Sequence, residues 1–182
     1  MRLVRAATFL VLGGLVACAG RQEATTGELS FEWSSTDTTV GVGSWSGRAE
    51  AVWCEAQHRL TVFAARGDTG AALLVLLPAA LVPADSIPLV VAADSGPAPR
   101  ATIATRWSSA RAVMALKSDS GSLTLTQTAP TLAGRFAGTL AVADAESAAP
   151  VVRGRLQDVV VVGGDAGCRL AGVGQSPDSG VP

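Results

Sequence analysis

Residues able to catalyse a reaction or bind a metal are scarce in this sequence of 182 residues. His58 is its single histidine, so a catalytic triad or a histidine-rich metal site would need a second chain. A metal site made of His58 and the distant cysteines Cys54 and Cys168 is not favoured. We therefore expect no metal and no cofactor.

Asp68-Thr69-Gly70-Ala71 is the one motif that would identify an enzyme. It resembles the active-site loop of aspartic proteases, in which two aspartates share a proton and activate a water. A single copy in a chain of this size is similar to the homodimeric, retroviral-type enzymes, and Leu132-Ala133-Gly134-Arg135 is similar to their second, apolar-apolar-glycine element. The resemblance implies a dimeric protease with Asp68 as its catalytic residue.

The residues before this motif favour a different interpretation. Arg66 and Gly67 precede Asp68, whereas those proteases enter the aspartate directly from an apolar strand. Aspartate and glycine also supply the backbone conformations of tight turns. We expect Asp68 at the tip of a hairpin, and keep the protease as the alternative.

The first 18 residues have the organisation of an export signal. Arg2 and Arg5 precede an apolar run over 6–17, which is shorter than the roughly 20 residues that cross a bilayer as a helix. The run ends in Leu15-Val16-Ala17-Cys18, which resembles the lipobox of bacterial lipoproteins. The resemblance implies cleavage before Cys18, a lipid on the Cys18 thiol, and attachment to the cell envelope. Ala19 is compatible with the outer membrane.

A lipid on Cys18 would leave Cys54 and Cys168 as a pair in an oxidising compartment. We expect them to form a disulfide. Both lie at the ends of expected strands, where two sheet edges can meet. Such a bond would close most of the folded domain into one loop.

Composition limits the class of protein and the class of partner. Apolar residues make up 48% of the chain and charged residues 16%, which is typical of a globular domain. The formal net charge of −1 gives no basic field for nucleic acid. The expected partners are the membrane, through the lipid on Cys18, and an envelope protein or an apolar ligand.

The chain divides into four parts: a signal peptide at 1–17, a flexible tether at 18–27, a β-domain at 28–171 and a disordered tail at 172–182. Within the β-domain, apolar and polar residues alternate with the period of a strand. Turn residues separate these stretches. We expect strands over 28–33, 43–54, 58–65, 71–77, 89–92, 101–107, 110–117, 122–128, 131–142 and 150–162.

Eight to ten short strands predict an all-β, antiparallel sandwich or barrel, ending in a β-meander. The strand pattern of the meander resembles that of small all-β bacterial lipoproteins. This resemblance bears on the fold alone. The run at 71–77 is apolar throughout, which predicts a strand inside a sheet covered on both faces. We expect the four tryptophans to pack in the core near the disulfide. The function expected is binding or structural, without catalysis.

Overall fold

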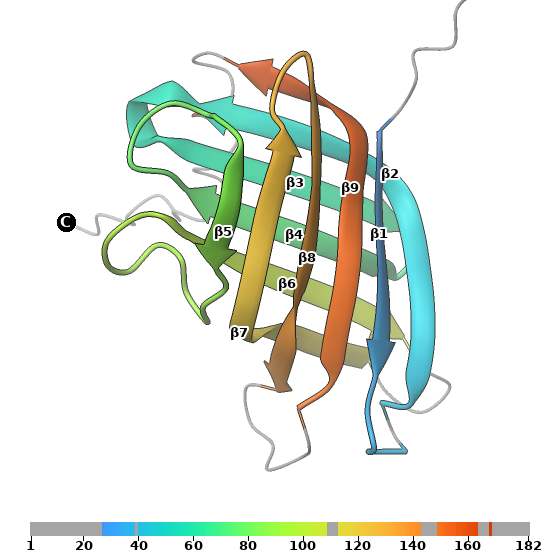
Figure 1. Cartoon of the computed structure of the whole chain (residues 1–182). Coiled ribbons are helices and arrows are strands. Elements are labelled where there is room, and N and C mark those ends of the chain that lie inside the picture. Colours follow the sequence, from blue (N-terminus) through green and yellow to red (C-terminus); the bar gives the residue numbers. More distant parts are fainter. Residues whose placement is uncertain (1–26, 39, 109–112, 143–148, 164–167, 169–182) are drawn as a thin grey trace, which may run out of the picture.

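The structure, a computed structural model, describes residues 27–38, 40–108, 113–142, 149–163 and 168. The expected signal peptide, Cys18, the tether as far as residue 26 and the tail at 172–182 lie outside these residues. Within them the chain forms nine strands (Figure 1), so the prediction of eight to ten is confirmed. These strands are β1 (Glu28–Ser34), β2 (Val42–Cys54), β3 (Arg59–Arg66), β4 (Thr69–Leu76), β5 (Ala84–Pro88), β6 (Arg100–Ser108), β7 (Val113–Gln127), β8 (Thr131–Val142) and β9 (Val151–Gly163).

Eight of the strands close into an antiparallel barrel, which decides between the two predicted architectures. The strand order is β5-β7-β6-β4-β3-β2-β1-β9-β8, and β8 pairs with β7 to complete the ring. β5 adds to β7 beyond the point where β6 stops pairing with it. The predicted terminal meander is confirmed as β7, β8 and β9.

The alternating pattern decides which side chains fill the barrel. In β3, for example, Leu60, Val62 and Ala64 are buried while Phe63 and Ala65 on the other face are exposed. Because successive side chains of a strand point to opposite faces, the apolar set of each strand lies inside the ring. The resulting core is mainly aliphatic at one end and aromatic at the other.

β1 is a short strand inserted between two long ones. Over its whole length it pairs antiparallel with β2 and with β9. Beyond the amino-terminal end of β1, strands β2 and β9 pair directly with each other. There Ala51–Trp53 of β2 pair in parallel with Val161–Gly163 of β9. β1 therefore widens the barrel wall at one end only.

The segment at 84–92 was predicted wrongly. The structure has strand β5 at Ala84–Pro88, and the expected strand at 89–92 is reduced to a single bridge between Leu89 and Ala101. No ladder continues at Val90. Its N–H donates to the carbonyl of Ala101 at 2.9 Å, and its carbonyl accepts hydrogen bonds from the Thr102 hydroxyl at 2.9 Å and the Ser118 hydroxyl at 2.8 Å.

The two strands predicted at 110–117 and 122–128 are one strand, β7. The polar residues between them do not form a loop, because β8 continues to pair through Ser118, Ser120 and Gly121 with a local irregularity. The first residues of the earlier prediction, 110–112, lie outside the described part of the chain. β4 does lie between β3 and β6, but its outer face is covered only in part, because Ala72 is exposed whereas Leu74 and Leu76 are half-buried.

The disulfide between Cys54 and Cys168 is confirmed. Their α-carbons are 4.9 Å apart, and the two residues are separated by 114 positions in the sequence. Cys54 ends β2 and is buried, so the bond ties the end of a barrel strand to the chain that follows β9.

Candidate functional site

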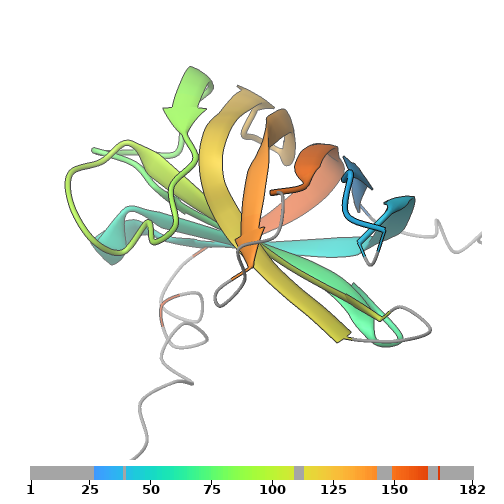
Figure 2. The same ribbon diagram turned by 90° about the horizontal axis from the view of Figure 1, so that it is seen from below.

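The barrel wall is incomplete along one half of β2. Residues Ala49 to Cys54 pair with β3, whereas residues 42–48 pair only with β1. Seen from below, β1 and β2 diverge from the end of the β3–β4 hairpin (Figure 2). We call this discontinuity, between residues 42–48 of β2 and Arg66 at the end of β3, the seam.

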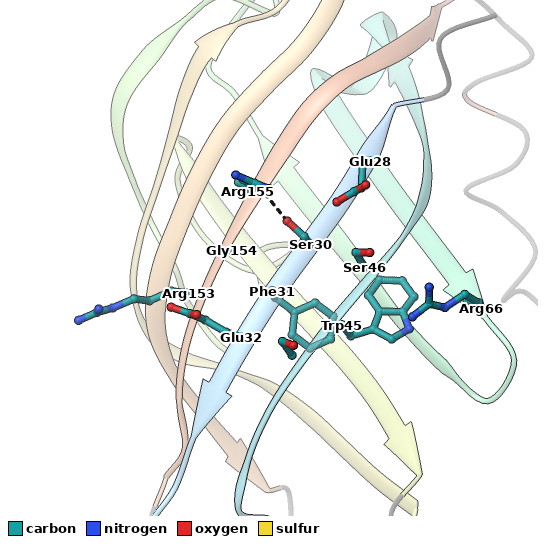
Figure 3. A pocket seen from close by; sticks show the side chains of 11 residues that line it. Glu28, Ser30, Phe31, Glu32, Trp45, Ser46, Arg66, Arg153, Gly154 and Arg155 are labelled. Carbon is teal, nitrogen blue, oxygen red and sulfur yellow. Dashed lines mark hydrogen bonds between the residues drawn. The ribbon is translucent and has the colours of Figure 1, made fainter. Parts of the chain in front are cut away.

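A groove runs beside the seam over the outer face of β1. Ser30 lies opposite Ser46 on one side and Arg155 on the other, and Glu32 lies opposite Ser44 and Arg153. Side chains opposite one another in a sheet share a face, so the serines form the floor of the groove, Glu28 and Glu32 lie on β1 to either side of Ser30, and the arginines of β9 form one side. The groove has a volume of about 620 Å³ and is lined by Glu28, Ser30, Phe31, Glu32, Ser44, Trp45, Ser46, Arg66, Arg153, Gly154 and Arg155 (Figure 3).

Charges of both signs surround the serine floor. Glu28 and Glu32 come from β1, Arg153 and Arg155 from β9, and Arg66 from the neighbouring hairpin. One of these charges is already engaged, because the Nε–H of Arg155 donates a hydrogen bond of 3.2 Å to the Ser30 hydroxyl. The groove is therefore suited to a polar ligand that offers hydrogen-bonding groups and at least one charge.

Beneath the groove lies a cluster of four aromatic rings inside the barrel. Phe31 is at its centre, with ring centroids 5.6 Å from Trp33, 5.4 Å from Trp45 and 6.5 Å from Trp107. The rings lie close over the strands because Gly43 and Gly47 have no side chain: a Cβ on either would overlap Trp33 or Trp45. This cluster gives the groove a rigid base.

The tryptophan prediction is half right. Trp45 and Trp107 do pack in the core, and the partly buried Trp33 and Trp53 are packed against it. The cluster is not near the disulfide, however, because Trp45 and Cys54 lie towards opposite ends of β2.

Trp45 and Arg66 face each other at the seam. The guanidinium carbon of Arg66 lies 6.0 Å from the centroid of the Trp45 ring, within the range of a cation–π contact. Trp45 is only 7% exposed, and its indole N–H has no hydrogen-bond acceptor among the described residues. Buried polar groups are almost always satisfied, so this N–H marks a place where an acceptor is missing.

Asp68 lies where the turn interpretation places it. Gly67 and Asp68 form a two-residue connection between β3 and β4, with Gly67 at φ 61° and Asp68 exposed. The second protease-like element, 132–135, lies on β8, which is not a neighbour of β3 or β4. The structure therefore does not bring the two elements together within one chain, and the dimeric protease stays a prediction.

The remaining predicted residues contribute no site in the described part of the chain. His58 is exposed at the start of β3, and the described residues contain no group of three or more His, Cys, Asp or Glu side chains able to hold a metal. Cys18 lies outside the described residues. Nor does any helix among the residues described have the length and apolar character needed to span a membrane.

The groove itself was not predicted from the sequence. Its serines and arginines alternate with core residues on β1, β2 and β9, and in the sequence they look like the ordinary solvent-facing side of three strands. Only the pairing of β1 with β9 brings Arg153 and Arg155 beside Ser30 and Glu32.

Comparison with known proteins adds no family to this description: no protein-family pattern, curated protein or solved structure matches the chain. The site has to be interpreted from its own geometry.

Proposed function

We propose that this protein is a lipid-anchored binding domain of the cell envelope, at the outer membrane, and that it holds a polypeptide partner in the groove over β1. The observation that carries the proposal is the groove itself, with its serine floor and its charges of both signs.

The chemistry of the groove favours a polypeptide over the apolar ligand that composition alone left open. Serine hydroxyls both donate and accept hydrogen bonds, and the flanking glutamates and arginines can pair with side chains of either sign. The apolar residues of the barrel, by contrast, are packed against one another in its core. An apolar molecule would gain little from a polar surface groove.

The position of the groove suits an anchored protein. Glu28, which lines the groove, is the first residue of β1 and follows the expected tether directly. Fully extended, the chain from Cys18 to Glu28 would reach at most about 35 Å. A lipid on Cys18 would hold the groove close to the membrane surface, where it would meet other envelope proteins.

Replacing the lipidation residue should release the protein from the membrane. We expect Cys18→Ser to move it to the soluble fraction and to remove the acyl mass from the intact protein. Cys168→Ser is the matched control, because it also replaces one cysteine by serine but should leave the protein membrane-bound. A soluble wild-type protein without acyl mass would contradict the anchor.

Binding at the groove can be tested in cells with a photo-crosslinking amino acid. Placed at Ser44 in the groove, it should give a discrete crosslinked product with another polypeptide. Placed at Ser86, an exposed serine on the distant strand β5, it should not. Identical patterns at the two positions would contradict the proposed binding function.

A further inference from the structure

One side of β2 carries unpaired backbone groups at the seam. The amide N–H of Ala49 donates to the carbonyl of Gly27 at 2.8 Å, which fixes the side of β2 that faces β1. Because backbone groups alternate along an antiparallel strand, those of Ser44, Ser46 and Arg48 point away from β1. Since the backbone groups of Ala49 face Gly27, its pairing with Ala64 of β3 engages the neighbouring Arg48, so of these three only Ser44 and Ser46 have no strand partner on this side among the described residues.

This edge lacks the features that usually prevent a strand from pairing further. Exposed edges are normally blunted by proline, lysine, a bulge or a covering segment. Residues 42–48 contain no proline and no lysine, and their pairing with β1 runs without a register shift.

The opposite side of the seam supplies a cation. Arg66 lies on the β3–β4 hairpin and lines the same groove as Ser44 and Ser46 (Figure 3). Its guanidinium contacts the Trp45 ring and forms no ion pair with the described residues. Asp68 is the nearest carboxylate along its own hairpin, and it lies at the exposed tip.

We propose that an extended polypeptide segment with an acidic side chain binds in the seam by adding a strand to β2. This rests on the proposed function and specifies its partner. The backbone of the segment bonds to the N–H and C=O groups of Ser44 and Ser46, and its carboxylate pairs with Arg66. Main-chain bonds supply affinity in this binding mode, and side-chain pairing supplies selectivity. A guanidinium and a carboxylate form one of the stronger hydrogen-bonded pairs.

A displayed library of random octapeptides, selected against the lipidated full-length protein in nanodiscs, tests this proposal. We expect enrichment of peptides that combine one aspartate or glutamate with β-branched residues. On binding of an enriched peptide, the amides of Ser44 and Ser46 should become protected from hydrogen exchange. Binders that protect none of these amides, or a library that yields no binder, would overturn the proposal.

Two pairs of measurements separate the contribution of the β2 backbone to binding from that of the Arg66 charge. Ser46→Pro removes an N–H that points into the seam and leaves the bonds of β2 to β1 in place, so affinity should fall by at least about tenfold. Ser46→Ala keeps this N–H and removes only the hydroxyl, so its loss of affinity should be clearly smaller. Arg66→Gln should weaken the binding of an acidic peptide by about tenfold. The affinity for the analogue in which an amide replaces the carboxylate should not change. If Ser46→Pro fails to fold, hydrogen exchange in the wild type still shows whether the peptide adds a strand to β2.

The outcomes distinguish this proposal from the function on which it rests. A crosslink at Ser44 together with peptide binding that tolerates Ser46→Pro would retain the groove and overturn the strand addition. Identical crosslinks at Ser44 and Ser86 would overturn the function itself. A dimer that dissociates on Ser46→Pro would show that a second copy fills the seam, and would overturn the choice of partner.

Discussion

Removing the disulfide should lower the free energy of unfolding by about 3 to 5 kcal/mol. In the chain-entropy model a cross-link restricts the unfolded chain, and the effect grows with the length of the closed loop. Here the bond joins residues separated by 114 positions and encloses seven complete strands, β3 to β9. Urea denaturation of the Cys54→Ala/Cys168→Ala protein measures the loss.

Two controls isolate the cross-link from the packing of its sulfur atoms. Cys168→Ser breaks the bond but leaves the buried Cys54 side chain in place, so most of the loss should persist. A reducing agent should destabilise the wild type and have no effect on the double variant. Equal unfolding midpoints for the wild type with and without reductant would contradict the prediction.

Replacing Phe31 by alanine should cost about 3 to 5 kcal/mol of stability. Phe31 is only 3% exposed, and its ring touches three tryptophans from three different strands. Truncation leaves a cavity where β1, β2 and β6 meet, and the surrounding rings cannot close it without leaving their positions. The emission of the native protein should also shift to longer wavelength, because Trp33, Trp45 and Trp107 would become less shielded from water.

Phe63 provides the matched control for Phe31. It lies on the outer face of β3 and is 42% exposed, so its replacement by alanine should cost no more than about 1 kcal/mol. Tryptophan emission should not change. Equal losses for Phe31→Ala and Phe63→Ala would show that the aromatic cluster is not a main source of stability.

Strands that alternate strictly were predictable from the sequence, and strands fixed by distant partners were not. β1, β2, β8 and β9 were expected within two residues of their observed ends, because each has one apolar face towards the core. β5 was missed since Ala84–Pro88 has little alternation and is a strand only because β7 offers an edge beyond the end of β6.

Local sequence also cannot distinguish a fully covered strand from one with an exposed apolar face. The run at 71–77 is apolar on both faces, yet nothing among the described residues covers Ala72. The seam could not be predicted from the sequence either, because it depends on where β3 stops pairing with β2. The disulfide could be predicted, because the prediction needed only the number of cysteines and an oxidising compartment.

The insertion of β1 between β2 and β9 bears on the order in which the barrel can form. Chains are made from the amino terminus, so β1 and β2 emerge first while β9, the second neighbour of β1, emerges last. The wall cannot close until nearly the whole domain is available, and pairings this distant in sequence make folding slow. Until β9 arrives, β1 has one unpaired edge, to which a strand of another chain could add.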